Sequence, residues 1–172
     1  MTIFIDEALA RFNPEESGEA RRLFHGRGTC YPGYEHLVVN WFPPFLQVIN
    51  YRPAENFLEK ADLVELSNQL KVSEGLVLQS RDGRRIDNEV LLGQVPNKHV
   101  TQELGKKYWA KLLDNQNVGL FLDMGQVRRW LESRVKGKKV LNLFAYTCAF
   151  SVAALSYGAR RVVNVDMSKN AL

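Results

Sequence analysis

The segment 140–166 restricts the possible folds of this chain more than any other stretch. It reads VLNLFAYTCAFSVAALSYGARRVVNVD, in which VLNLF and RVVNV are nearly continuous apolar runs. Such runs are typical of strands in a parallel sheet, because both faces of that sheet are covered. The stretch between them, AFSVAALSYGA, has the small and apolar residues of a crossover helix. The pattern therefore predicts a right-handed strand–helix–strand unit with buried parallel strands.

The loop that follows the first of these strands is the place to look for a ligand. Parallel sheets bind ligands at the carboxyl ends of their strands, where FAYTC and Asp166 both lie. An acid at the end of the second strand can accept hydrogen bonds from the two hydroxyls of a ribose. Each such bond contributes about 1.5–3 kcal/mol. The alternative is a helix cap for the following residues, worth about 1 kcal/mol, and the two roles are compatible.

The composition of the loop indicates which nucleoside it would hold. A dinucleotide site uses G-x-G-x-x-G, so that a pyrophosphate can approach the helix N-terminus. Here no glycine occurs between Asn142 and Tyr157, and Phe144 and Tyr146 are bulky. A cofactor with adenosine and no phosphates fits better, and S-adenosylmethionine is the obvious candidate.

The residues upstream predict a small α+β domain over 1–115. HLVVNW and FLQVINY, separated by Pro43-Pro44, predict a hairpin. Two helices are expected, one over EALARF with Asp6 as its cap and one over 53–70. Strands are expected over GLVLQSR and EVLLGQV. A further pair of strands, HVTQEL and KKYWAKLL, should turn at Gly105. From 116 onward a second unit begins. Its first helix should be capped by Asp123 and should carry an apolar stripe of Val127, Trp130, Leu131 and Val135.

Composition bounds the class of protein. The 172 residues are 45% hydrophobic and 24% charged, as in a soluble globular protein. No apolar run approaches the roughly 20 residues of a membrane span, and the N-terminus lacks the pattern of a secretory signal. Cys30 and Cys148 lie far apart, which favours a reduced, cytoplasmic protein. The net charge of +4 comes in scattered basic doublets, which are more often solvated surface but permit a nucleic-acid partner.

Three motifs resemble one family. NVGLFLDMGQVRRWL, VLNLFAYTCAFSVAALSYGA and VVNVDMSKNAL are similar to the bacterial large-subunit ribosomal RNA methyltransferases. Two branches are close: the cytosine-5 enzymes (methyltransferase I) and the guanine-N7 enzymes (the K half of the fused K/L protein). The resemblance is strong over the last third of the chain and weaker but collinear from RLFHGRGTCYPGYEHLVVN onward. It implies an α/β fold, in which an α+β domain precedes the start of a Rossmann-like class I methyltransferase sheet, with S-adenosylmethionine as cofactor and ribosomal RNA as partner.

The resemblance also implies roles for individual residues. The loop 142–147 would lie under the methionine portion of the cofactor, Asp166 would bind the ribose, and Met167 would pack on the adenine. Arg128 matches an arginine that could meet the cofactor carboxylate or an RNA phosphate; the alternative for Arg128 and Arg129 is a solvated helix face. The expected cofactor-binding residues are Phe121, Asp123, Asn142, Leu143, Phe144, Ala145, Tyr146, Thr147, Asp166, Met167 and Ser168.

Two positions depart from the family pattern. The family usually has arginine where this chain has Gly125, so one charge contact would be missing. It usually has glycine where this chain has Cys148, and a non-glycine residue would be strained there if its φ is positive. Cys148 is expected to be a small packed residue rather than a nucleophile. The three histidines have no metal-ligand spacing, so no metal site is expected.

The C-terminal boundary bears on the mechanism that the resemblance implies. Family members continue with strands that include an Asp/Asn-Pro-Pro motif over the target base, and many begin with an RNA-binding PUA domain; neither is found here. We therefore expect a truncated methyltransferase portion with part of the cofactor site, no catalytic residue, and an open sheet edge through which it could self-associate. The C-terminal segment is expected to pack on another copy or to be less ordered than the rest. Two other hypotheses remain: a non-catalytic RNA-binding module, and a nucleotide-binding oxidoreductase.

Overall fold

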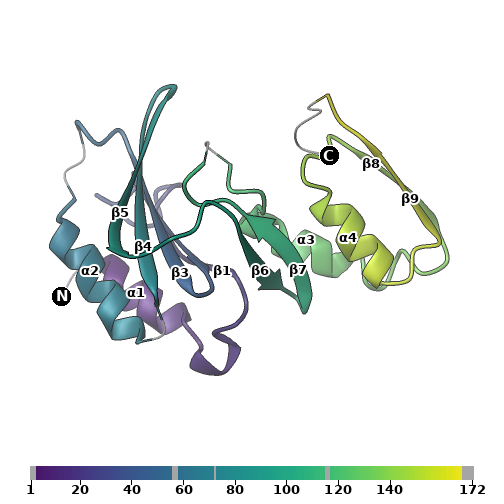
Figure 1. The fold of residues 1–172 in the computed structure, drawn as a ribbon, viewed down its shortest axis with the longest axis horizontal. Coiled ribbons are helices and arrows are strands. Elements are labelled where there is room, and N and C mark those ends of the chain that lie inside the picture. Colours follow the sequence, from purple (N-terminus) through teal and green to yellow (C-terminus); the bar gives the residue numbers. More distant parts are fainter. Residues whose placement is uncertain (1–2, 56–57, 72, 115–116, 168–172) are drawn as a thin grey trace.

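A mixed five-stranded sheet forms the larger lobe of the protein in the computed structural model, which describes residues 3–55, 58–71, 73–114 and 117–167 (Figure 1). The strand order is β1-β2-β3-β4-β5, with β3 and β4 parallel and the other neighbours antiparallel. The predicted hairpin is confirmed, because Leu37 to Phe42 pair with Asn50 to Phe45 across Pro43-Pro44. The strands are β1 (Arg21–His25), β2 (Leu37–Phe42), β3 (Phe45–Tyr51), β4 (Gly75–Asp82) and β5 (Arg85–Gly93).

Two helices, α1 (Ile3–Arg11) and α2 (Lys60–Leu70), cover one face of this sheet (Figure 1). Alternate residues of the strands point toward them, since side chains on successive strand positions face opposite ways. The resulting core includes Phe4, Leu23, Leu37, Val39, Trp41, Leu46, Val48, Leu63, Leu66, Leu76 and Leu78. The opposite face of the same strands carries the polar side chains of Asn40, Gln47 and Gln79.

Both predicted N-terminal helices exist, but their starts were predicted wrongly. Asp6 lies inside the first turn of α1 rather than before it, so it is not the cap. The second helix begins at Lys60 and not at 53, because residues 53–55 form a turn and Glu59, directly before the helix, has an extended backbone with a ψ of 117°. Residues 56–57 lie outside the described part of the chain.

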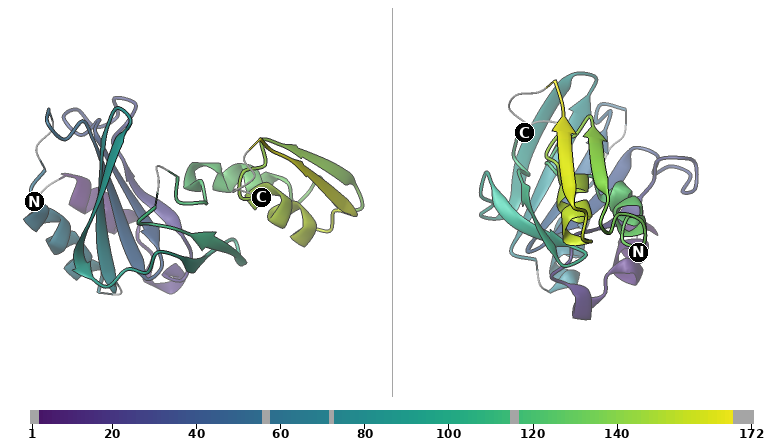
Figure 2. Two further views of the ribbon diagram at one scale, coloured as in Figure 1. Left: turned by 45° about the horizontal axis from the view of Figure 1, so that its top comes forward. Right: turned by 90° about the vertical axis from the view of Figure 1, so that its right-hand side faces the viewer.

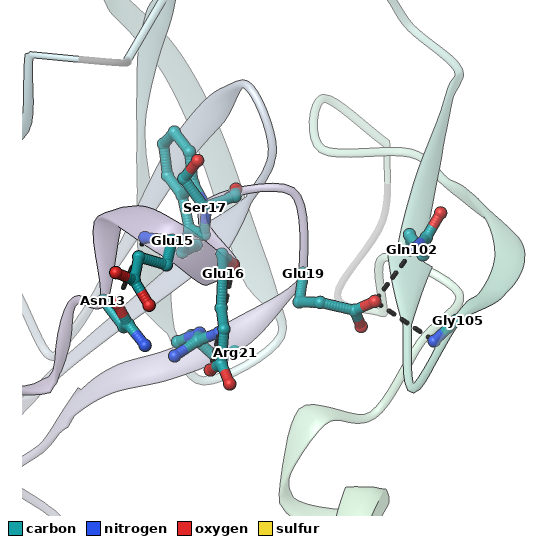
Figure 3. A network of polar contacts seen from close by, with 9 residues as sticks. Asn13, Glu15, Glu16, Ser17, Glu19, Arg21, Gln102 and Gly105 are labelled. Carbon is teal, nitrogen blue, oxygen red and sulfur yellow. Dashed lines mark hydrogen bonds and ion pairs between the residues drawn. The ribbon is translucent and has the colours of Figure 1, made fainter.

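A separate hairpin, β6 (His99–Glu103) and β7 (Lys106–Ala110), follows the sheet and turns at Gly105 as predicted. It is tied to the segment before β1. The Glu19 carboxylate accepts hydrogen bonds from the Gln102 amide at 2.9 Å and from the backbone N–H of Gly105 at 3.1 Å (Figure 3). The backbone N–H of Ala20 also donates to Gln102 O at 2.6 Å. These contacts fix the hairpin to the larger lobe.

The C-terminal unit confirms the strand–helix–strand prediction. β8 (Lys139–Leu143) and β9 (Arg161–Val165) are parallel, with α4 (Ala149–Ser156) between them in the sequence. The unit lies beside the β6–β7 hairpin and away from α1 and α2 (Figures 1 and 2). It is preceded by a 3₁₀ helix, η2 (Leu122–Met124), and by α3 (Gly125–Trp130). Asp123 lies within η2, so its predicted role as the cap of α3 is wrong.

Two apolar surfaces of this unit are open, contrary to the prediction of burial. α4 covers one face of the β8–β9 pair, and Leu141 and Val165, on the other face, are 62% and 50% exposed. Among the described residues no second layer covers that face, so the strands are not covered on both sides. In the stripe predicted for α3, Val127 and Trp130 are exposed and only Val135 is buried. That another copy covers these surfaces stays a prediction.

A second apolar cluster crosses the boundary predicted at residue 115. Phe42 and Phe45 from the large sheet pack in it with residues of β7, and Val118, Leu120 and Ala149 join from the later segment. The two units therefore share buried surface. No helix in the described ranges has the length and apolarity required to cross a bilayer.

Candidate functional site

The loop between β8 and α4 has an unusual backbone. Phe144, Tyr146 and Cys148 have φ values of 55°, 47° and 60°, in the left-handed region that L-residues rarely adopt. The conformation turns the backbone N–H of Tyr146 toward the end of β9, where it donates to Asp166 Oδ2 at 2.7 Å. The backbone N–H of Ala145 donates to Val165 O at 3.2 Å. The predicted position of Asp166 at the mouth of this loop is thereby confirmed.

A polar network beneath α4 holds the base of the loop. The Asn142 side-chain amide donates to Ser151 Oγ at 2.8 Å and to Asn164 Oδ1 at 3.2 Å, and the Ser151 hydroxyl donates to the same Asn164 oxygen. The side chain of Asn142 is thus hydrogen-bonded within the C-terminal unit. Phe144, by contrast, is 84% exposed and projects from the loop.

The segment before η2 packs against the same loop. The Thr147 hydroxyl donates to Gly119 O, and the Tyr146 hydroxyl donates to Asn117 O at 3.1 Å. The rings of Phe121 and Tyr146 are 5.6 Å apart. Partial burial raises the pKa of Tyr146, so its hydroxyl stays protonated and able to donate at neutral pH. Residues far apart in the sequence therefore meet around Tyr146.

Most of the residues predicted to bind the cofactor lie at this loop, but not all of them do. Met167 follows Asp166 and is 93% exposed, and Ser168 lies outside the described residues. Asp123 lines a cavity between the segment 117–123 and the large sheet, together with Arg22 and His25. The residues that the fold brings together at the loop are Phe121, Leu143, Phe144, Ala145, Tyr146, Thr147 and Asp166.

Arg128 is a buried residue of α3. Its side chain is 1% exposed, and its Nε and Nη2 atoms donate to the two carboxylate oxygens of Glu103 at 2.6 and 2.7 Å. Nη2 also donates to Phe121 O at 2.7 Å. The solvated-face alternative is therefore wrong for Arg128, whereas Arg129 is exposed. Contact of Arg128 with a cofactor carboxylate or RNA phosphate stays a prediction, and the structure gives it a partner that the sequence did not reveal.

The Glu103–Arg128 pair also explains one departure from the family pattern. A Cβ atom at Gly125 would lie 3.0 Å from Glu103 Oε1. An arginine at this position would crowd the carboxylate that binds Arg128. The glycine thus allows Glu103 to approach the start of α3.

Cys148 is a half-buried residue with a strained backbone, and that it is not a nucleophile stays a prediction. Burial, followed by the nearby Asp166 carboxylate, raises the pKa of its thiol, which disfavours the reactive thiolate at neutral pH. Cys30 and Cys148 are both free thiols. Within the described ranges, no group of three His, Cys, Asp or Glu side chains is placed to hold a metal ion.

Replacing Cys148 with glycine is expected to stabilise the protein by about 0.5–1 kcal/mol. A left-handed conformation costs an L-residue roughly 1–2 kcal/mol, of which glycine's greater freedom in the unfolded chain offsets a part. Urea denaturation of Cys148→Gly against Cys148→Ala measures this, because alanine removes the thiol and keeps the Cβ. An equal gain in the alanine variant would contradict the backbone explanation.

Comparison with known proteins agrees with this geometry. A family model described as S-adenosylmethionine-dependent methyltransferase matches residues 21–172. The ribosomal RNA large subunit methyltransferase K/L of Aeromonas hydrophila is 43% identical over 175 residues, covering 96% of this chain and 24% of that protein. Methyltransferase I of Vibrio vulnificus (strain YJ016) is 36% identical over 141 residues, covering 81% and 32%.

Solved structures show the same fold. A putative methyltransferase from Streptococcus mutans aligns with a TM-score of 0.78 and 29% identity, covering 98% of this chain and 44% of that one. A putative methyltransferase complexed with S-adenosylhomocysteine (SAH) aligns with a TM-score of 0.77 at the same identity, covering 98% and 45%. The chain therefore spans less than half the length of these relatives. Because the family match includes nearly all of the sequence, the protein belongs to the S-adenosylmethionine-dependent methyltransferases related to ribosomal RNA large subunit methyltransferases I and K/L.

Proposed function

We propose that this chain forms the first part of the cofactor pocket of an S-adenosylmethionine-dependent methyltransferase that acts on large-subunit ribosomal RNA. The observation that carries the proposal is the carboxylate of Asp166 at the mouth of a glycine-free loop. A carboxylate at the second strand end suits a ribose diol, and the side chains of Phe144 and Tyr146 disfavour a pyrophosphate across the turn.

The residues of the loop fit an adenosyl cofactor by their chemistry. Asp166 would accept hydrogen bonds from the ribose, and Met167 would offer an apolar surface to the adenine. The loop 144–147 and Phe121 would enclose the methionine portion and keep water from it. When bound, S-adenosylmethionine supplies the methyl group. None of the described residues is proposed to be catalytic. Cytosine carbon-5 and guanine N-7 are both candidate acceptor atoms, because the sequence motifs resemble both branches, and relatives named methyltransferase I and methyltransferase K/L both match.

We expect SAH, and not NAD⁺ or NADH, to bind the protein. A ligand that binds only the folded state at about 100 times its Kd stabilises that state by about 2.7 kcal/mol. The thermal midpoint should therefore rise with SAH concentration, and isothermal titration should give a single site. Stabilisation by NAD⁺ without SAH binding would support the oxidoreductase instead, and RNA binding without either ligand would support the non-catalytic RNA-binding module.

A further inference from the structure

The face of the large sheet opposite α1 and α2 forms one wall of a cavity. Alternate residues of β2, β3 and β4 point to it, and the register places Asn40 directly opposite Gln47. The segment 117–123 forms the other wall, and the space between them is about 250 Å³. A cavity lined by amides and guanidinium groups is suited to a polar ligand rather than to a hydrocarbon.

Arginines dominate the charge of this cavity. Arg22, Arg27 and Arg81 line it, with Asp123 as the acid. Neither Arg22 nor Arg27 forms an ion pair with an acid of the described residues. Burial and the charges of Arg22 and Arg27 lower the pKa of His25, so that it adds no charge at neutral pH. The cavity therefore attracts an anion.

The arginines are held in place by contacts within the wall. Arg22 Nε donates to Asn40 Oδ1 at 3.2 Å. The guanidinium of Arg27 lies 4.5 Å from the ring centroid of Tyr51, and that of Arg81 lies 5.4 Å from the same centroid. Arg81 Nη1 also donates to the Tyr51 hydroxyl at 3.3 Å. Planar guanidinium groups that are already oriented lose little freedom when they bind a phosphate.

A buried donor in the same wall lacks a partner. Arg22 can only donate, so Asn40 must turn its Oδ1 to Arg22 and its Nδ2 to Gln47 Oε1, at 3.1 Å. This chain of bonds leaves Gln47 Nε2 without a hydrogen bond, in a side chain that is 0% exposed. Buried donors are normally paired, so this amide is an independent sign that the cavity takes a ligand with an acceptor atom.

The cavity continues into a second hollow. Arg27, Tyr51 and Arg81 line both spaces, and the second one adds Glu35, His36, Arg52, Glu55 and Gly83. The wall segment 117–123 also contacts the candidate cofactor loop, through Gly119 O and the Phe121 ring. A strand that passes through the two hollows would therefore run beside that loop.

We propose that this cavity binds one nucleotide of a single-stranded RNA segment, with its phosphate at the three arginines and its base turned to Gln47. The proposal rests on the proposed function, since it takes RNA as the substrate. Phosphates are bound well by arginine forks, and base edges carry acceptor atoms that an amide N–H can meet. The second hollow would take the next nucleotide of the strand.

The test measures binding of a fluorescently labelled, mixed-sequence single-stranded RNA to the full chain by anisotropy. Arg22→Gln, Arg27→Gln and Gln47→Leu should each weaken binding at least about tenfold, as expected for lost contacts to a nucleotide. The arginine variants should also reduce the slope of log affinity against log salt by about 0.7 each. The matched control is Arg85→Gln, which removes an arginine of the same sheet that is 79% exposed and outside the cavity; it should change affinity less than twofold.

Additional measurements separate the possible failures. Arg27 is exposed at the rim, so its variant should fold even if the variant at Arg22 does not. A nucleoside 5′-monophosphate should compete with the RNA better than inorganic phosphate; equal competition would show an anion site only and would overturn the proposal. Equal RNA affinity of Arg27→Gln and Arg85→Gln would also overturn it. SAH titration of the unsubstituted chain tests the proposed function separately, because absence of SAH binding there would sink that function and leave the cavity assignment to be judged by RNA affinity.

Discussion

Replacing Glu103 with alanine is expected to lower the free energy of unfolding by about 3–5 kcal/mol, the range for breaking a buried ion pair from one side. Glu103 accepts two hydrogen bonds from Arg128, and the two side chains are 7% and 1% exposed. Without the carboxylate, Arg128 keeps its charge in a buried place, where Phe121 O is its one remaining hydrogen-bond acceptor among the described residues. The loss should also loosen the segment at Phe121 and weaken SAH binding.

Urea denaturation followed by tryptophan fluorescence measures this effect. The control is Glu89→Ala, because the Glu89–Lys60 pair is 52% and 57% exposed and such pairs contribute about 0–1 kcal/mol. The double variant Glu103→Leu, Arg128→Met should recover most of the loss, since apolar replacement of a whole buried pair is often neutral. A cost for Glu103→Ala no larger than that for Glu89→Ala would show that the pair contributes little.

The sequence predicted those features that depend on local pattern. Apolar runs around a helical stretch indicated β8, α4 and β9, and the same pattern placed Asp166 beside the loop. Gly105 marked a hairpin turn through its conformational freedom, and its φ is 72°. Helix starts were less reliable: acids at Asp6 and Asp123 resemble caps, yet both lie inside helical turns. A cap depends on one backbone conformation, which residue type alone does not determine.

Features that join distant segments could not be predicted in the same way. Arg128 looked like part of a surface doublet, because its partner Glu103 is 25 positions away on another element. The arginine cavity had a weak signal that was missed: Asn40 and Gln47 interrupt apolar strands at positions that share one face. The exposure of Leu141 and Val165 was also not predicted. An apolar strand is buried on both faces only where a second layer covers it, and the strand's own sequence does not show whether that layer is present.

Replacing Asp166 with asparagine is expected to weaken SAH binding about 10–100-fold, in line with about 1.5–3 kcal/mol for a hydrogen bond to a charged group. Asparagine keeps one oxygen that can accept from the backbone N–H of Tyr146, so the loop should hold its shape. It replaces the other oxygen with a donor, which can serve a ribose hydroxyl only weakly. Asp166→Ala removes both oxygens and should weaken binding further.

The two possible roles of Asp166 predict different effects on SAH affinity and on stability. If Asp166 binds the ribose, Asp166→Asn lowers SAH affinity in calorimetric titration and leaves the urea midpoint nearly unchanged. If it serves only as a helix cap, the alanine variant loses about 1 kcal/mol of stability and SAH affinity is unaffected. Asp87→Asn is the control, because Asp87 is an exposed acid of β5 paired with Arg85. Equal SAH affinity in Asp166→Asn and Asp87→Asn would rule out the ribose contact and remove the main support for an adenosyl cofactor at this loop.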